Sequence, residues 1–402
     1  MANLSKINQL DPVMQRLQSE SSENTRTRER NAFAAFAGSN EERIILFGAG
    51  PLGHMVLEGL EEAGIPPIAF ADNNERLWLT EIKGIPVLSP SIAVERYRDS
   101  GCFVVTIYNG SPVRRKLKKL GCRNVAPFAA LFWKYADVFT PQYGIDLPHK
   151  LPAFTDEIGT CHEVLADEQS RCELAGQIEW RYWLDNDALP TPLDPTKTYF
   201  PMDLISPSDD EVFVDCGSFQ GDILPSFTSH WNSKFQRVFA LEPDPQNREV
   251  LEANTRKMGL TDRVTVLPYA AGHQSGLVSF QSTGTVTSQM VEAGPQSLSV
   301  ECRRLDDISW PLTPTYIKMD IEGAEPQAIV GATDLLRHHH PILAICTYHR
   351  TEHLWQIPNL IHSIDPEYNL FLRRYAEECW EGVCYAIPDH RLKGSSSCRV
   401  ML

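Results

Sequence analysis

The stretch VFVDCGSFQGD, residues 212–222, joins an apolar run to an acid and two glycines. The run predicts a buried strand ending on Asp215, and Gly217 and Gly221 complete the pattern D-x-G-x-x-x-G. In an open α/β sheet such a strand carries its last residue to the carboxyl edge, where ligands bind. Without a Cβ, Gly217 lets the backbone pass beneath a ligand, and Gly221 lets the next helix pack closely.

A second acid, Glu242, ends the next predicted strand, RVFALE. A carboxylate at that edge can accept hydrogen bonds from both hydroxyls of a ribose. Asp215 and Glu242 together would repel a free phosphate, whereas a cationic ligand with an unphosphorylated ribose would be attracted. S-adenosylmethionine carries a sulfonium, an ammonium and such a ribose, so the two acids predict this cofactor. The alternative is that both acids only cap helices at strand ends.

Charged residues also end two later predicted strands. In YIKMDIEGAE, alternation along an extended strand places Lys318, Asp320 and Glu322 on one face. In PILAICTYHR, His349 ends its strand, where a histidine can act as a general base near neutral pH. Methyl transfer needs an aligned acceptor and the removal of one proton, so Asp320, His349 and Lys318 are the candidate catalytic residues. The alternatives are a buried Lys–Asp pair that orders the loop, and a hydrogen-bonded histidine at the rim.

The same acidic cluster could hold a metal ion. Asp320, Glu322 and His349 could converge, and hard oxygen ligands would suit magnesium. The sequence does not decide this, and we favour methyl transfer without a metal. The three histidines at 338–340 fit a helix-to-strand turn better than a zinc site, because consecutive side chains point in different directions.

A different glycine pattern, FGAGPLG, lies near the start of the chain. Gly48, Gly50 and Gly53 have the G-x-G-x-x-G spacing between a predicted strand and helix, which admits a phosphate to the helix N–H groups. Asp72 ends the next strand, where a ribose-binding acid would lie. These residues predict a nucleotide or nucleotide-sugar site, with a ligand-free scaffold as an equal alternative. A nicotinamide-dependent redox unit is the weaker reading, because no partner domain for hydride transfer is evident.

Five stretches in order resemble the FkbM family of S-adenosylmethionine-dependent methyltransferases: VFVDCGSFQGD, VFALEPDPQNREVLEANT, LPYAAG, SVECRRLDDI and YIKMDIEGAEPQAIVGA. The resemblance implies a class I methyltransferase sheet, seven strands with the last antiparallel, and O-methylation of sugars or hydroxylated natural products. It implies cofactor binding by Asp215, Gly217, Ser218, Gly221 and Glu242, with Ala270 or Ala271 near the adenine. The stretch around Cys216 departs from the small residues and Asn of many relatives. The front segment resembles the small Rossmann-like domain of bacterial sugar acyltransferases, which can hold a nucleotide-sugar.

The alternation of strands and helices predicts an α/β chain: a doubly wound sheet preceded by a smaller Rossmann-like domain. The expected parts are a helical, flexible segment (1–40), the Rossmann-like domain (41–130), a Pro-rich and helical connector (131–210), the methyltransferase domain (211–390) and a flexible tail (391–402).

The amino-acid composition limits the classes of binding partner that the protein is expected to have. The 402 residues carry a formal charge of −15, which argues against nucleic acid as a partner. No apolar run approaches the ~20 residues that span a membrane. Ten cysteines without a CxxC pair suit reduced thiols in the cytoplasm. We therefore expect a cytoplasmic O-methyltransferase acting on a sugar or nucleotide-linked precursor, with a homo-oligomer also compatible. The alternative is a non-catalytic nucleotide- or cofactor-binding module that acts through protein interactions.

Overall fold

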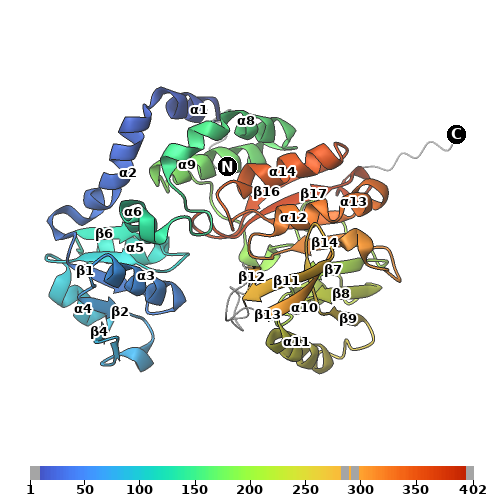
Figure 1. Cartoon of the computed structure of the whole chain (residues 1–402), viewed down its shortest axis with the longest axis horizontal. Coiled ribbons are helices and arrows are strands. Elements are labelled where there is room, and N and C mark those ends of the chain that lie inside the picture. Colours follow the sequence, from blue (N-terminus) through green and yellow to red (C-terminus); the bar gives the residue numbers. More distant parts are fainter. Residues whose placement is uncertain (1–9, 282–288, 291–297, 395–402) are drawn as a thin grey trace. The chain divides into compact units, whose positions relative to one another are not determined.

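A computed structural model of the chain describes residues 10–281, 289–290 and 298–394. Residue contacts divide the chain into two compact units that interleave along the sequence. Unit 1 contains residues 1–155, 175–192 and 376–380, and unit 2 contains residues 156–174, 193–375 and 381–402. Figure 1 draws unit 1 mostly in blue and cyan and unit 2 mostly in yellow to red. The predicted connector is therefore shared between the two units.

Unit 1 is built on a six-stranded sheet in the order β3-β4-β2-β1-β5-β6. Its pairs are parallel except β3 with β4. The elements are α1 (Leu10–Ser19), α2 (Ser22–Ala37), β1 (Ile44–Phe47), α3 (Pro51–Glu62), β2 (Ala69–Ala71), β3 (Glu81–Ile82), β4 (Ile85–Leu88), α4 (Pro90–Tyr97), β5 (Cys102–Val105), α5 (Ser111–Lys119), β6 (Asn124–Pro127), α6 (Phe128–Lys134) and α7 (Ala136–Phe139). The predicted strand–glycine turn–helix is β1, the loop at Gly48 and α3.

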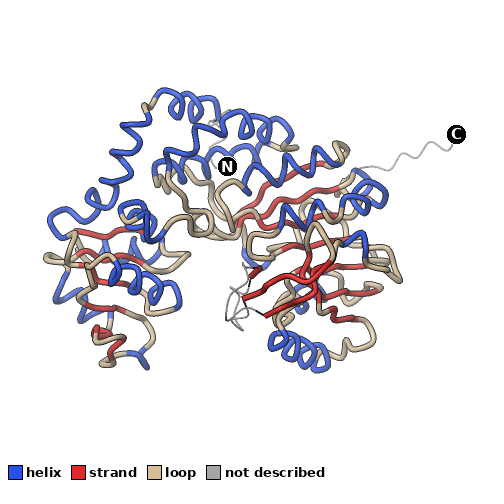
Figure 2. The backbone as a smooth tube through the Cα atoms, viewed as in Figure 1, coloured by secondary structure: helices blue, strands red, loops and turns tan. Residues whose placement is uncertain are grey.

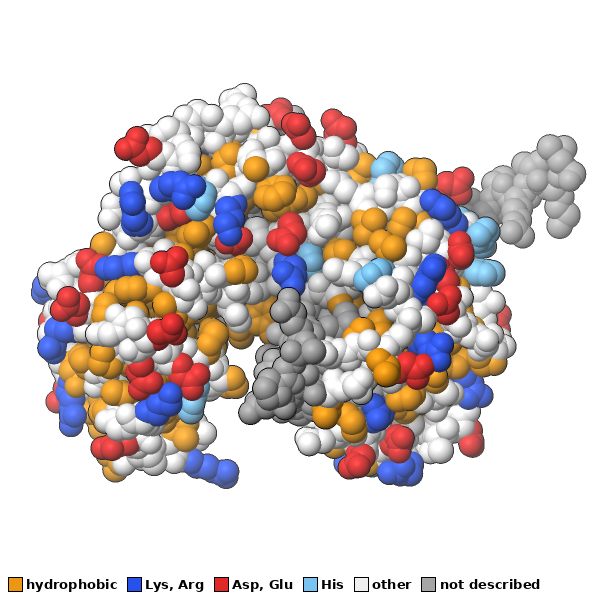
Figure 3. Space-filling model, viewed as in Figure 1, with side chains coloured by type: hydrophobic (Ala, Val, Ile, Leu, Met, Phe, Trp, Pro, Cys, Tyr) orange, Lys and Arg blue, Asp and Glu red, His pale blue; other side chains and the backbone are white. Residues whose placement is uncertain are grey.

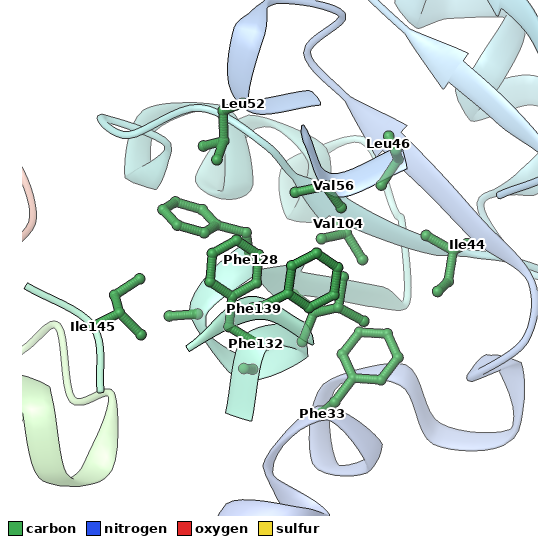
Figure 4. Close-up of a cluster of buried hydrophobic side chains, with 14 of the residues drawn as sticks. Phe33, Ile44, Leu46, Leu52, Val56, Val104, Phe128, Phe132, Phe139 and Ile145 are labelled. Carbon is green, nitrogen blue, oxygen red and sulfur yellow. The ribbon is translucent and has the colours of Figure 1, made fainter. Parts of the chain in front are cut away.

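Aromatic side chains from several elements fill the core of unit 1 (Figure 4). Phe128 and Phe132 of α6 pack edge to face, and Phe132 stacks on Phe139 at a centroid distance of 4.6 Å. Phe33 of α2 is fully buried in the same cluster. The helix α2, which the sequence placed in a flexible segment, therefore has an apolar face in this core.

Two helices lie in the connector, which the two units share. They are α8 (Thr155–Val164) and α9 (Glu168–Trp183), and the break between them interrupts one long helical pattern in the sequence. Leu165, inside this break, forms an isolated bridge with Leu370 of β16. The break therefore adds backbone pairing to the edge of the sheet in unit 2.

Unit 2 contains a seven-stranded sheet in the order β16-β17-β15-β14-β7-β8-β9, in which β17 runs antiparallel to both neighbours. This confirms the predicted sheet, and Figure 2 shows its strands side by side among the helices. The elements are β7 (Val212–Cys216), α10 (Leu224–His230), β8 (Arg237–Leu241), α11 (Pro245–Lys257), β9 (Val264–Leu267), β14 (Tyr316–Met319), α12 (Glu325–Val330), α13 (Thr333–His339), β15 (Ile342–Cys346), α14 (His353–Ile364), β16 (Asn369–Arg374) and β17 (Gly382–Ile387).

A smaller four-stranded sheet is inserted between β9 and β14. Its order is β10-β13-β11-β12, with β10 (Tyr269–Ala271), β11 (Gly276–Gln281), β12 (Gln289–Met290) and β13 (Leu298–Arg303). The alternation of polar and apolar residues predicted strands here.

Within the described residues, none of the helices is long and apolar enough to cross a bilayer. On the face in Figure 3, Lys and Arg side chains are interspersed with Asp and Glu, without a large basic patch.

Candidate active site

The register of β7 and β14 creates a buried ion pair. Asp215 lies opposite Lys318, and Phe213 lies opposite Tyr316. Because alternate residues share a face, the charged pair continues the face on which these two rings pack, 5.6 Å between centroids. Lys318 Nζ is 2.9 Å from Asp215 Oδ1 and donates to the carbonyl oxygen of Gly217 at 2.9 Å.

The charge of Asp215 is thus matched inside the protein. Burial would lower the pKa of Lys318, but the charges of Asp215 and Asp320 raise it above its usual value, so the lysine keeps its proton. The sequence predicts that Asp215 is one of two acids that face a cationic ligand. In the structure, the strand register already places a cation of the protein, Lys318 of β14, beside Asp215. Asp215 Oδ2 is buried and accepts no hydrogen bond within the described part of the chain.

The two glycines after β7 allow close packing. Gly217 has φ +76°, and a Cβ there would lie 2.0 Å from the carbonyl oxygen of Asp320. Gly221 has φ +80°, and its Cβ would meet Leu251 of α11 at 2.7 Å. The carbonyl group of Asp320, directly after β14, therefore packs against Gly217 where a Cβ would otherwise lie. This contact brings Asp320 beside the loop.

A matched pair of glycine substitutions tests this packing. We expect Gly217→Ala to lower the free energy of unfolding by at least about 3 kcal/mol, because the left-handed backbone and the clash with a carbonyl add. Gly259→Ala is the control, since Gly259 has φ +70° with nothing near its Cβ position, and it should cost only about 1 kcal/mol. Urea unfolding of both variants measures the difference. Equal losses would contradict the packing role.

Glu242 follows β8 and is fixed by backbone donors. Its Oε2 accepts the N–H of Phe219 at 2.8 Å, and its Oε1 accepts the N–H of Asp244 at 2.9 Å. The side chain is buried, and burial, with smaller effects from the charges of Asp244 and Asp215, raises its pKa to about 7 against these two hydrogen bonds. Each carboxylate oxygen keeps a second lone pair. Glu242 can therefore accept two further hydrogen bonds, which is what a ribose diol offers.

Asp320 lies directly after β14 and is surrounded by donors. Its Oδ2 accepts the hydroxyl of Tyr199 at 2.8 Å, and its Oδ1 is 3.3 Å from His349 Nε2. The hydroxyl of Tyr348 is 3.4 Å from the same Oδ1. The Asp320 side chain is 25% exposed, whereas that of His349 is 1% exposed. Asp320 is thus the member of the pair that can meet a ligand directly.

A buried carboxylate orients His349 from behind. Glu325 Oε1 is 2.8 Å from His349 Nδ1 and also accepts the N–H of Ile321 at 2.9 Å. Burial would lower the pKa of His349, but Glu325 and Asp320 raise it well above its usual value. Burial would raise the pKa of Asp320, but the hydrogen bond from His349 and the charge of Lys318 hold it low. The pair is therefore an imidazolium and a carboxylate.

Left-handed backbone occurs at several positions around these groups, as it does elsewhere in the described part of the chain. Four non-glycine residues of the site have positive φ: Tyr199 (69°), Phe219 (47°), Glu322 (55°) and Glu381 (55°). Each such residue costs on the order of 1 kcal/mol or more, and this kind of strain is typical of functional sites. Glu381 follows the β16–β17 loop, and burial together with the charge of Asp320 raises its pKa to about 7.

The possible metal ligands do not all converge. The atoms of Asp320, Glu325 and His349 lie within 4.8 Å of one another. Glu322, which the sequence placed in this set, is 3.9 Å from His349 Nε2 and is outside that group. Glu325 is the last acid of the K-x-D-x-E-G-A-E stretch, so the motif contained it. Its carboxylate already accepts backbone N–H groups, which suits an orienting role better than direct metal binding.

The other predicted cofactor residues lie at or near the same edge. Ser218 is buried and its hydroxyl donates to the carbonyl of Asp215 at 2.8 Å, so it stabilises the loop. Ala270 and Ala271 are buried in β10, which begins two residues after β9, and the carbonyl of Leu267 at the end of β9 accepts the N–H of Glu242 at 3.0 Å. Sequence reasoning missed Tyr199, because nothing marked it within the Pro-rich connector.

In unit 1, Asp72 closes the first glycine loop. Its Oδ2 accepts the N–H of Ala49 at 2.7 Å and its Oδ1 accepts that of Asn74 at 2.7 Å. A Cβ on Gly53 would lie 2.0 Å from the carbonyl oxygen of Gly48, whereas Gly50 has open space at its Cβ position. The loop has the predicted form, and Asp72 accepts backbone N–H groups in the same pattern as Glu242 does in unit 2.

Unit 2 has a seven-stranded sheet with an antiparallel β17, and acids lie at the end of β7 and after β8. These features define an α/β protein of the methyltransferase type. Residues 215–379 match the family model described as the methyltransferase FkbM domain. This part of the chain is therefore similar to FkbM methyltransferase domains, a family that implies S-adenosylmethionine as the methyl donor.

A solved structure shares the fold of nearly the whole chain. It is the methyltransferase FkbM from Methylobacillus flagellatus KT, with a TM-score of 0.72 and 24% identity over 94% of this chain and 98% of that one. The precorrin-6y C5,15-methyltransferase from Geobacter metallireducens GS-15 is a weak match, with a TM-score of 0.29, 15% identity and coverage of 48% and 85%. No curated protein matches the sequence.

Proposed function

We propose that the chain is an S-adenosylmethionine-dependent O-methyltransferase that acts on a hydroxyl of a sugar or of a nucleotide-linked glycan or natural-product precursor. One observation carries the proposal: a partly exposed carboxylate, Asp320, is held beside the glycine loop and next to His349, in a chain with an FkbM domain. The proposal places the enzyme in the cytoplasm, and its support there is that no disulfide joins the nine cysteines among the described residues.

The residues at the edge of β7 and β8 fit the cofactor. Glu242 would hold the ribose hydroxyls, and the orphaned Asp215 Oδ2 would accept a donor from the cationic end after a small movement of the loop. When bound, S-adenosylmethionine supplies an activated methyl group. The protein then has to align the acceptor hydroxyl and take its proton.

Asp320 is the proposed proton acceptor. His349 holds its proton between two carboxylates, which disfavours the general-base role that the sequence suggested for it. Its imidazolium instead orients Asp320 Oδ1 and balances the charge of the carboxylate. Asp320 Oδ2 is oriented by Tyr199, so both oxygens have defined directions. Lys318 neutralises the charge of Asp215 at the end of β7. It does not contact the acceptor in this proposal.

The raised pKa of Glu242 predicts a pH-dependent affinity for the cofactor product, S-adenosylhomocysteine. Hydrogen bonds from a ribose favour the carboxylate, so below a pKa of about 7 binding must first release a proton. We expect binding to weaken about tenfold between about pH 8 and about pH 6. Calorimetry on the wild type and on Glu242→Gln measures this. An equal pH dependence in the variant would contradict the assignment to Glu242.

The activity test uses labelled S-adenosylmethionine and a panel of nucleotide-sugars, each with and without magnesium. Transfer of label to an acceptor hydroxyl supports the proposal, and the magnesium arms decide whether the acidic cluster needs a metal. Binding of S-adenosylhomocysteine without transfer to any acceptor would favour the cofactor-binding module instead. Absence of binding would overturn both.

A further inference from the structure

A five-residue segment crosses from one unit to the other. Ala376–Trp380 belongs to unit 1, although the strands on either side of it, β16 and β17, belong to the seven-stranded sheet of unit 2. The backbone leaves unit 2 after Tyr375 and re-enters it at Glu381. The β16–β17 loop is therefore part of the packing of unit 1.

The segment binds at the ligand edge of the unit 1 sheet. In this sheet, β2 and β4 lie on one side of β1, and β5 and β6 lie on its other side. The strand order therefore reverses between β1 and β5, which flank the topological switch point. Ligands of open α/β sheets bind at such points. Asn109 and α5 follow β5 directly, and the N–H of Glu377 donates to Asn109 Oδ1 at 2.9 Å.

A buried carboxylate occupies the start of α5. Glu378 Oε1 accepts Arg114 Nη1 at 2.7 Å and the Ser111 hydroxyl at 3.2 Å. The side chain of Glu378 is 1% exposed and that of Arg114 is 8% exposed. A second donor of Arg114, Nη2, bonds the Ser111 hydroxyl at 2.8 Å. This is an anion site built from a guanidinium and a hydroxyl, and the chain itself supplies the anion.

Aromatic packing fixes the other end of the segment. The ring of Trp380 contacts Tyr108 edge to face at 5.0 Å, stacks on Phe128 at 5.8 Å and meets Trp180 at 6.0 Å. Cys379 is fully buried in the same core. The segment is thus held by a hydrogen bond, an ion pair and an apolar anchor within five residues.

The predicted ribose acid, Asp72, keeps free acceptor capacity. Its Oδ2 accepts the N–H of Ala49 in the glycine loop and its Oδ1 accepts that of Asn74, so each oxygen keeps a second lone pair, as in Glu242. The cation after β5, in contrast, is satisfied by the protein itself.

We propose that unit 1 is a docking module for the β16–β17 loop: Arg114 and Ser111, at the start of the helix after β5, bind the carboxylate of Glu378. The docked segment is followed directly along the chain by Glu381, which belongs to unit 2. The docking does not depend on the proposed function. Glu381 feels the charges of Asp320 and His349.

Hydrogen exchange of the full chain tests the docking. The Glu377 amide should be protected in the wild type and should exchange at least about tenfold faster in Arg114→Met, which leaves a buried carboxylate without its cation. The double variant Arg114→Met/Glu378→Met replaces the ion pair by apolar groups and should return protection to within about threefold. The control is Arg115→Gln/Glu377→Gln, which removes the neighbouring, exposed pair and should change little.

Nucleotides provide the second arm. We expect no binding of NAD or UDP-N-acetylglucosamine to the wild type at ligand concentrations on the order of 1 mM. Binding of either one with loss of protection at residues 376–380 would overturn the proposal, because the site would then take a nucleotide in place of Glu378. Unprotected exchange of the Glu377 amide in the wild type, or no response to Arg114→Met, would also overturn it. If the wild type failed to bind S-adenosylhomocysteine while its Glu377 amide remained protected, the result would count against the proposed function and not against the docking.

Discussion

Replacing Glu242 with alanine is expected to weaken the binding of S-adenosylhomocysteine by at least about 100-fold. A charge-assisted hydrogen bond contributes about 1.5–3 kcal/mol, and a ribose diol would lose two of them. The variant also leaves the N–H groups of Phe219 and Asp244 without their acceptor, so the loop after β7 loses its anchor. Isothermal calorimetry at pH 8 measures the loss.

Two further variants separate the ribose contact from general damage. Glu242→Gln keeps the size of the side chain and one carbonyl oxygen, so we expect an intermediate loss of roughly tenfold. Glu249→Ala on α11 removes an exposed acid from the same unit and should leave binding unchanged. If Glu242→Ala bound within threefold of the wild type while remaining folded, the cofactor site would have to lie elsewhere.

Replacing Asp320 with asparagine is expected to lower the turnover of methyl transfer by about 1000-fold. General-base catalysis contributes about 10²–10⁴, and the amide cannot take up the proton. Its size is preserved, so binding of S-adenosylhomocysteine should stay within threefold of the wild type. The measurement is kcat with the acceptor found in the nucleotide-sugar panel.

Controls for Asp320 follow from its neighbours. Tyr199→Phe removes only the hydroxyl that orients Asp320 Oδ2, so we expect a smaller loss, about tenfold in kcat. Asp262→Asn changes an exposed acid of the same unit and should have no effect. Turnover of Asp320→Asn within threefold of the wild type would show that the proton leaves by another route. Glu381, whose raised pKa is near neutral, would then be the next residue to substitute.

The division into interleaved units changes how the front of the chain is understood. A nucleotide site at Gly48 and a ligand-free scaffold were equal alternatives in the sequence. The occupied site at Arg114 favours the scaffold, with a specific role in holding the β16–β17 loop. This contact could not be read from spacing, because Glu378 is far from Arg114 in the sequence.

The sheet of unit 2 and the residues at its edge were predictable for a simple reason. Apolar strands that end on acids or glycines mark both the strand and its carboxyl end, so Asp215, Glu242 and Asp320 could be placed at one edge from local patterns. The number of strands and the antiparallel last strand came from the family resemblance, and the structure confirms both.

What the sequence alone determined is therefore the class of sheet, the acids at its carboxyl edge and the similarity of residues 215–379 to the FkbM domain. Only the tertiary structure decided which charges meet: Lys318 with Asp215, Glu325 behind His349, Tyr199 on Asp320, and Glu378 in unit 1. Strand and turn patterns depend on residues that are close together in the sequence, so the sequence alone is enough to recognise them. Ion pairs depend on strand register and on long-range packing, which bring together residues that no sequence spacing relates.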